Sequence, residues 1–199
     1  MKLKETLGNI DIYLFDQILK ERYLTTEAIL DAGCGNGRNL YWFYNNNYNI
    51  FGIDKDKKKL EAIKKIYPRL AENFYTASVE AMPFKNETFH HVICNAVLHF
   101  AESTIHFEAM CSELVRVLKI NGTLFVRMTS NIGIENNIDL VSEGVFKLPD
   151  GTTRFLITKN LLKKIMKKHS LSFLEPLKTV NVNNKRCMTT LVLKKLPNN

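Results

Sequence analysis

Three glycines, Gly33, Gly35 and Gly37, alternate with other residues where an apolar stretch of the chain ends. Glycine has no Cβ and adopts positive φ readily, so such a loop lets a ligand approach the backbone closely. Asp31 lies at the end of the apolar stretch, and its carboxylate suits a ligand with a positive end better than a pyrophosphate. The nicotinamide-binding pattern G-x-G-x-x-G requires a glycine where this chain has Arg38, which disfavours an oxidoreductase.

A second acidic residue, Asp54, follows the run Phe51-Gly52-Ile53 and lies 21 residues after Gly33. In doubly wound folds a carboxylate at about this separation accepts hydrogen bonds from both ribose hydroxyls of a bound nucleotide. The alternative interpretation of Asp54 is an ordinary turn residue at a strand end. The glycine loop favours the first interpretation, so we expect a ligand that contains a ribose.

Four further segments follow in order, and together with the loop they extend over residues 27–128. They are Ala77–Phe84, Thr88–Ile93, Asn95–Phe100 and Leu114–Leu124. With D-x-G-C-G-x-G-R-N at the loop, the chain resembles the class I S-adenosylmethionine-dependent methyltransferases, in particular the small-molecule subgroup similar to types 11 and 25. Five motifs in order make an accidental likeness improbable.

The resemblance implies a Rossmann-like, doubly wound α/β fold: a mostly parallel seven-stranded sheet with helices on both faces and an antiparallel last strand. It also implies S-adenosyl-L-methionine as cofactor and S-adenosyl-L-homocysteine as product. The cofactor-binding residues that it implies are Asp31, Gly33, Cys34, Gly35, Gly37, Arg38, Asp54, Ser78, Val79, Glu80 and Asn95. At Ser78 the family often has an acidic residue, so contact with the adenine amine would fall to Ser78 or to the Val79 backbone.

His99 follows the fourth predicted strand, where the open edge of such a sheet faces the ligand. It is a candidate general base if the methyl acceptor must lose a proton; a packed polar residue is the alternative. Tyr13 is a second candidate catalytic residue and, with Asp16 and Gln17, is expected to cap the pocket. Tyr13, His99, Arg127 and Arg154 are candidate substrate residues, and Arg186 is a further candidate for binding an anionic group. We expect no metal.

The elements that must position these residues alternate between short β-branched runs and helical segments. Strands are predicted at 28–32, 49–53, 73–76, 92–96, 123–127, 173–182 and 187–194, and helices at 10–23, 38–46, 57–67, 103–118 and 160–169. We expect a single domain, residues 1–199. Its parts are an N-terminal capping helix (1–26), a cofactor-binding core (27–128), a substrate lid with a hairpin at Pro149-Asp150-Gly151 (129–158), and a C-terminal helix and strands (159–199).

Composition and charge narrow the class of protein further. The 199 residues are 45% hydrophobic, enough for a full-sized core, and the four cysteines show no metal or disulfide spacing. No membrane span or signal peptide fits, so we expect a cytoplasmic protein, a monomer or homodimer. The net charge of +8 is concentrated in residues 151–199, with 11 basic residues against Glu175.

That basic region keeps two alternatives open: a non-catalytic S-adenosylmethionine-sensing module with an RNA- or lipid-contacting face, and an RNA methyltransferase. The chain lacks an N-P-P-Y or D-P-P-Y element after the fourth strand, which makes a nucleic-acid partner unlikely. The favoured function is methyl transfer to a small molecule whose identity the sequence does not specify.

Overall fold

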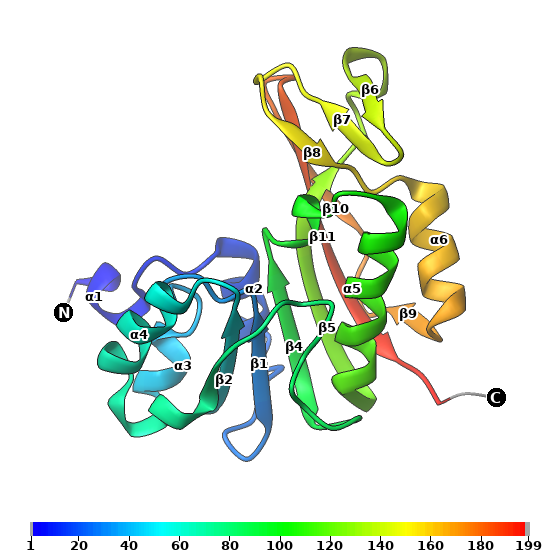
Figure 1. The fold of residues 1–199 in the computed structure, drawn as a ribbon. Coiled ribbons are helices and arrows are strands. Elements are labelled where there is room, and N and C mark those ends of the chain that lie inside the picture. The colour runs from blue at the N-terminus through cyan, green and yellow to red at the C-terminus, as the bar shows by residue number, and fades with distance from the viewer. Residues whose placement is uncertain (1, 198–199) are drawn as a thin grey trace.

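The computed structural model describes residues 2–197, and its largest element is a sheet with helices on both faces (Figure 1). Seven strands follow one another in the order β10-β11-β5-β4-β1-β2-β3. They are β1 (Ala28–Ala32), β2 (Asn49–Asp54), β3 (Phe74–Thr76), β4 (Phe89–Asn95), β5 (Leu118–Ser130), β10 (Lys178–Val182) and β11 (Arg186–Lys195). β1 to β5 pair in parallel, and β11 is antiparallel to β5. The predicted fold class is confirmed, and the short β9 (Leu171–Phe173) adds an eighth strand beside β11.

Two sets of helices cover the sheet because neighbouring strand residues point to opposite faces. From β1, Ile29 packs in a cluster with residues of α2 (Ile12–Leu19), α3 (Tyr41–Asn45) and α4 (Lys57–Ile66). Leu30 packs in a second cluster with residues of α5 (Thr104–Val117) and α6 (Lys159–Lys168). With helices on both faces, all of β1 from Ile29 onward is buried, as the apolar sequence of this strand requires.

The strand order reverses between β1 and β4, which places the loops after β1, β2 and β4 at one edge of the sheet. The glycine loop follows β1, Asp54 ends β2, and the 3-10 helix η2 (Leu98–Phe100) follows β4. The glycine loop, Asp54 and residues 95–100 therefore meet at the carboxyl ends of the parallel strands. A short helix α1 (Leu3–Leu7), which was not predicted, precedes α2 near this edge (Figure 1).

Between β5 and α6 the chain forms a separate three-stranded antiparallel sheet above the main one (Figure 1). Its strands are β6 (Asp139–Ser142), β7 (Val145–Lys147) and β8 (Thr153–Phe155), preceded by the 3-10 helix η3 (Glu135–Asn137). The Pro149-Asp150-Gly151 turn joins β7 to β8, as predicted for a hairpin. Phe155 anchors the small sheet, because its ring stacks on Phe107 of α5 with centroids 4.6 Å apart.

Several predicted elements have different ends. The helix predicted at 38–46 begins only at Tyr41, after a turn in which Leu40 N–H donates to the Gly37 carbonyl. The strand predicted at 173–182 is divided into β9 and β10, and Pro176, which has no N–H to donate to a ladder, lies between them. A 3-10 helix, η1 (Pro68–Asn73), shortens β3. Over residues 2–197 no helix has the length and apolar character needed to cross a membrane.

Candidate functional site

The glycine loop is fixed to the end of β2 by backbone hydrogen bonds. The N–H groups of Gly33 and Cys34 both donate to the Ile53 carbonyl, at 2.9 and 2.8 Å. Gly33 has φ +81°, and a Cβ there would lie 2.4 Å from the Val97 side chain. Only glycine fits this position, because any side chain would meet both the unfavourable φ and the valine.

Gly35 forms the tip of the loop and faces open space. Its φ is +56°, and among residues 2–197 no heavy atom outside its chain neighbours lies within 4 Å of the position of a Cβ. Its N–H donates to Asp54 Oδ2 at 2.9 Å. The backbone at Gly35 is therefore accessible to a ligand, as the sequence predicts for this loop.

Asp54 ends β2 beside the loop. Its second oxygen, Oδ1, accepts from the N–H of Asp56 at 2.9 Å, so one carboxylate holds both the glycine loop and the start of α4. Each carboxylate oxygen has two lone pairs, so Asp54 can still accept further hydrogen bonds from a ligand. The half-buried carboxylate therefore holds the loop in place and keeps acceptor capacity for a ligand.

Asp31 is almost completely buried, with 1% of its surface exposed. Burial raises the pKa of its carboxyl to about 7; the Arg38 charge opposes this rise and the Asp54 charge adds to it. Within the described part of the chain, Oδ2 of Asp31 has no hydrogen-bond partner. A buried acceptor without a partner is costly, and a cationic ligand group would both satisfy it and stabilise its ionised form.

Asn95, at the end of β4, is the second buried side chain without partners. Neither polar atom of its amide has a hydrogen-bond partner among residues 2–197, although it is only 6% exposed. It faces the cleft in front of the glycine loop. Residues lining this cleft are Gly8, Asn9, Gly33, Cys34, Gly35, Asn36, Arg38, Asn39, Tyr41, Lys59, Ile66, Tyr67, Asn95 and Ala96.

Asn9 and Tyr67 line the cleft from segments outside the motifs, and Asn39, the last residue of the loop motif, contacts Asp11 outside them. The link between α1 and α2 contributes Asn9, whose carbonyl accepts from Arg38 Nη1 at 3.1 Å. Asn39 Oδ1 accepts from the N–H of Asp11, and the Tyr67 hydroxyl donates to the Gly37 carbonyl. No spacing in the sequence pairs these residues, because each contact joins residues 28 to 30 positions apart.

The predicted adenine-side residues lie after β3, next to β2. Ala77 N–H donates to the Asp54 carbonyl, which places Ser78 and Val79 directly after this contact. Val79 is buried, and the carboxylate of Glu80 lies 3.6 Å from His106 Nε2. The structure places these three residues at the same edge of the sheet as Asp54, but none of them lines the cleft at the loop.

The predicted substrate residues gather on the other side of Asn95. His99 lies in η2 and is 8% exposed, and its neighbour Phe100 stacks beneath Arg154 at 5.0 Å. Arg127 of β5 lies over the Tyr13 ring at 5.2 Å, and its Nη1 is 3.3 Å from Asp11 Oδ2. Four segments thus converge above the carboxyl ends of β4 and β5, at residues 13, 99, 127 and 154.

Asp16 and Gln17 do not cap this pocket. The Asp16 carboxylate accepts from Lys20 and Lys178, and buried Gln17 donates to Glu175, so both side chains attach α2 to the C-terminal strands. Leu14 and Gln17 are the buried residues of this helix. The prediction that Asp16 and Gln17 cap the pocket was wrong. Both side chains bind residues about 160 positions later in the chain, and no local pattern indicates such contacts.

Comparisons with known proteins agree with this architecture. Residues 30–126 match a family described as a methyltransferase domain. The chain is 37% identical over 111 residues to YodH, an uncharacterized methyltransferase of Bacillus subtilis (strain 168); the match covers 55% of this chain and 43% of that protein. The chain therefore matches less than half the length of that relative.

Two solved structures show the same fold. A SAM-dependent methyltransferase from Methanosarcina mazei has a TM-score of 0.73 at 17% identity, covering 91% of this chain and 98% of that one. The 1,6-didemethyltoxoflavin-N1-methyltransferase of Burkholderia thailandensis has a TM-score of 0.71 at 11% identity, covering 98% and 82%. The likeness extends beyond the family match to the helices and strands after residue 126.

Proposed function

We propose that the chain, whose residues 30–126 match a family described as a methyltransferase domain, binds S-adenosyl-L-methionine and methylates a small molecule. The observation that carries the proposal is the buried Asp31 carboxyl beside a glycine loop. This carboxyl has an unpartnered oxygen and a pKa raised to about 7, chiefly by burial. Such a group is costly in an empty protein and becomes favourable when a cation lies against it.

The residues present fit this cofactor. Asp31 binds the positively charged methionine end, the loop from Gly33 to Gly37 with Cys34 and Arg38 forms the wall of the cleft, and Asp54 accepts from the ribose hydroxyls. The Asn95 amide supplies a donor and an acceptor. Ser78 or the Val79 backbone, with Glu80, contacts the adenine.

When bound, S-adenosyl-L-methionine supplies a methyl group on a sulfonium sulfur, and S-adenosyl-L-homocysteine is the product. This chain's residues orient the acceptor and exclude water, which is the main requirement of an in-line displacement. An acceptor with a proton on its attacking atom must lose it, and His99 and Tyr13 are the groups that we propose to take that proton.

We infer that the whole chain works as one domain in which residues 129–158 cover the acceptor and α2 covers the cofactor. A cytoplasmic monomer or homodimer fits this proposal. The Burkholderia neighbour is named as the methyltransferase of a small molecule, 1,6-didemethyltoxoflavin, which supports an acceptor of this size.

The alternative of an RNA- or lipid-contacting sensor draws on the basic C-terminal region. In α6, Lys164 and Lys168 are both in ion pairs with Glu108, at 2.7 and 2.9 Å. These contacts neutralise part of the charge that would attract phosphate, which favours the enzyme. A gel shift with mixed RNA at low salt tests the alternative, since electrostatic binding would be strongest there.

Calorimetric titration with S-adenosyl-L-homocysteine, S-adenosyl-L-methionine and NADH tests the proposal. We expect micromolar binding of the first two and none of NADH. Gly35→Asn should abolish binding because its side chain fills open space where the ligand approaches, while asparagine tolerates positive φ. Gly151→Asn is the matched control, since Gly151 also has positive φ and open surroundings within the described residues. Equal binding by both variants would refute the assignment.

A further inference from the structure

Three arginines from three different strands surround the buried His99. Arg127 lies on β5, Arg154 on β8 and Arg186 at the start of β11. Their charges all act on the His99 imidazole: burial is the main cause that lowers its pKa to about 4, and these three guanidinium groups follow. Residues far apart in the sequence therefore bring their positive charges together around His99, beside the end of β4.

Backbone contacts establish how these elements come together. Arg127 pairs with Asn95 across β4 and β5, and its carbonyl accepts from the Ala96 N–H at 2.7 Å, just before η2. The guanidinium of Arg154 lies 5.0 Å from the centre of the Phe100 ring, which in turn lies 4.6 Å from the His99 ring. Arg186 Nη1 is 3.6 Å from an oxygen of Asp150, in the turn that leads to β8.

The carboxylates in ion-pair contact with the three arginines are too few to neutralise their positive charge. Asp11 is shared by Arg127 at 3.3 Å and Arg38 at 3.9 Å, and Asp150 pairs with Arg186. Arg154 is in ion-pair contact with no carboxylate of residues 2–197. Its Nη1 donates to the Thr153 carbonyl at 2.7 Å. The pocket thus has an excess of positive charge.

Hydrogen-bonding groups in the pocket are also incompletely satisfied. Three nitrogens of this cluster are buried and have no hydrogen-bond partner within residues 2–197: Nε of Arg127, Nε of Arg186 and Nδ1 of His99. Arginine nitrogens are donors only, so they require an acceptor. Buried donors without acceptors are rare in folded proteins, so these nitrogens can take an acceptor from water or from a ligand.

From the cluster of His99, Arg127, Arg154 and Arg186 we propose that the methyl acceptor carries a carboxylate or phosphate group, which this cluster binds. The proposal rests on the function proposed above and names the class of its acceptor. Oxygen atoms of such a group accept from the free Nε donors, and planar guanidinium groups match both anions in bidentate geometry.

Aromatic rings hold two of the guanidinium groups in place. Tyr13 lies against Arg127 and Phe100 against Arg154, at 5.2 and 5.0 Å from ring centre to guanidinium carbon. Contacts of this kind fix the plane of the guanidinium before a ligand arrives. The exposed Phe100 ring also offers an apolar surface to the rest of the acceptor.

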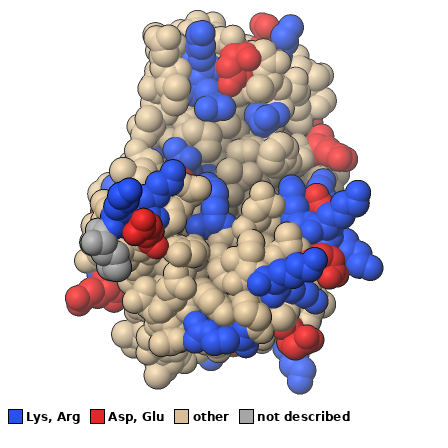
Figure 2. Space-filling model, turned by 90° about the vertical axis from the view of Figure 1, so that its left-hand side faces the viewer, with Lys and Arg blue, Asp and Glu red and all other residues tan. Residues whose placement is uncertain are grey.

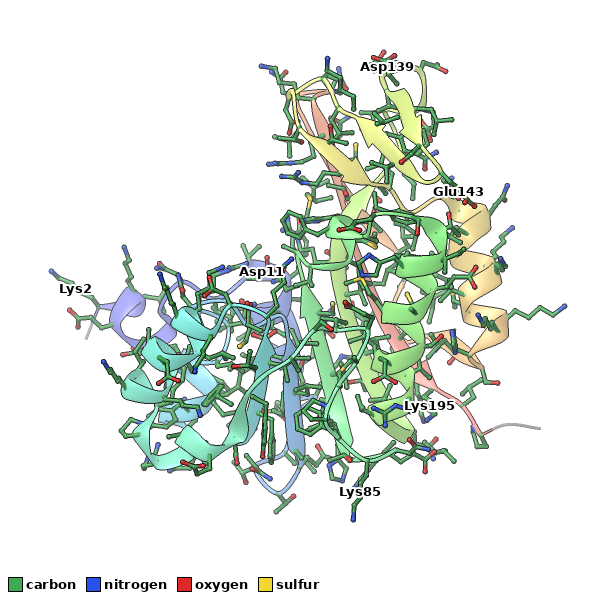
Figure 3. All side chains as sticks on the ribbon, in the orientation of Figure 1. Lys2, Asp11, Lys85, Asp139, Glu143 and Lys195 are labelled. Atoms are coloured by element: carbon green, nitrogen blue, oxygen red, sulfur yellow. The ribbon has the colours of Figure 1, made fainter. Side chains whose placement is uncertain are left out.

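The surface view agrees with a cationic entrance. Figure 2 shows Lys and Arg side chains in the hollow below the small sheet, and Lys and Arg interspersed with Asp and Glu on the upper part of the molecule. In Figure 3, Asp11 lies at the upper end of the main sheet, beneath the small sheet. An anion that enters from this side would meet positive potential first.

An anion in the pocket would also change His99. Burial is the main cause of the lowered pKa of His99, and the charges of the three arginines add to it. A bound anion would offset these three charges. The imidazole then becomes a stronger base only when the acceptor is bound. Binding of the anionic group and activation of the base would be coupled in this way.

The test uses the full chain and two-dimensional NMR of arginine Nε–Hε groups at constant ionic strength. Sodium acetate, inorganic phosphate and neutral acetamide are titrated separately, with and without saturating S-adenosyl-L-homocysteine. We expect saturable shifts of the Arg127 and Arg186 signals with acetate or phosphate and none with acetamide. The anion that binds more tightly identifies the group.

Arg154→Gln should weaken this anion binding at least about tenfold, the usual scale of a charge-assisted hydrogen bond. Lys147→Gln is the matched control, because Lys147 is next to Phe146, the cross-strand partner of Arg154, and so points to the opposite face of the small sheet. Absence of saturable shifts, equal shifts with acetamide, or equal effects of the two variants would overturn the proposal.

Calorimetry with S-adenosyl-L-homocysteine separates the two proposals. Arg154→Gln should bind it with wild-type affinity, because Arg154 lies outside the cleft at the glycine loop. Loss of anion shifts with intact cofactor binding would refute only the acceptor class. Failure of cofactor binding in the wild-type protein, with anion shifts present, would refute the methyltransferase function instead.

Discussion

The Gly35 N–H donates to Asp54 Oδ2 at 2.9 Å, so the tip of the glycine loop and the end of β2 are joined by one hydrogen bond. The same carboxylate accepts from the Asp56 N–H at the start of α4. The side chain proposed to bind ribose therefore already organises the two segments on either side of that ribose. Binding requires little rearrangement of the backbone, which favours affinity.

Asp54→Asn should weaken binding of S-adenosyl-L-homocysteine by about tenfold or more, because one acceptor oxygen becomes a donor and the charge is lost. Asp56→Asn is the control: Asp56 caps α4 through the N–H groups of Lys58 and Lys59, and asparagine caps equally well. Calorimetry on both variants provides the comparison. Equal affinities would mean that Asp54 serves only the fold.

Asp31 should release a proton when the cofactor binds near pH 6.5. Its pKa of about 7, raised by burial, leaves the free protein largely protonated there, and a cationic ligand favours the ionised form. Calorimetry in two buffers of different ionisation enthalpy measures the release. Asp31→Asn should eliminate it, and the same release from that variant would assign the proton to another group.

The same shift predicts a pH dependence of stability. The folded-state pKa of Asp31 lies above its ordinary value of 3.8, so its contribution to the free energy of unfolding is greatest at low pH. That contribution falls as pH rises from about 4 to about 7. Urea denaturation of Asp31→Asn should therefore show a smaller loss of stability over this interval than wild type.

His99 should affect stability in the opposite direction. Burial, then the three arginines, lowers its pKa from 6.5 to about 4, so the unfolded chain binds the proton more tightly. Stability should rise between about pH 4 and 6.5, and His99→Gln should reduce this rise. His91 and His169 also have lowered pKa values, so the measurement is the difference between wild type and variant. Identical pH profiles would contradict the prediction.

Gly33→Ala should destabilise the protein by about 3 kcal/mol. Alanine is strained in the left-handed backbone conformation at this position, and its Cβ would overpack the neighbouring side chain. Its Cβ would lie 2.4 Å from Val97, and Val97→Ala should restore part of the loss in the double variant. Gly151→Ala carries the backbone cost alone, since its Cβ would meet no other described residue within 4 Å. Thermal unfolding of the four proteins separates the two contributions.

Local patterns predicted the elements near the site well. β1 begins and ends where its apolar run does, and Gly33, Gly35 and Gly37 all adopt the positive φ for which glycine is suited. Binary patterning and glycine spacing are local, so one segment of sequence is enough to read them. The same holds for the hairpin at residues 149–151, whose turn residues specify it.

Contacts between distant segments could not be predicted in this way. The burial of Gln17 depends on Glu175, and the pocket around His99 depends on arginines at 127, 154 and 186. The sequence indicated Arg127, Arg154 and Arg186 individually as candidates but gave no reason for them to meet. Their convergence follows from the pairing of β5 with β11 and from the position of the small sheet, which are tertiary properties.

β8 is only three residues long, and two neighbours on it have separate tasks. Phe155 is fully buried against Phe107, whereas Arg154 points away from that contact and lies against Phe100. Residue 155 thus determines whether the small sheet stays attached, and residue 154 determines what charge it presents to the pocket. If the proposed acceptor class is correct, replacement of Arg154 would change the charge that β8 offers to the acceptor and leave the contact of Phe155 with Phe107 in place.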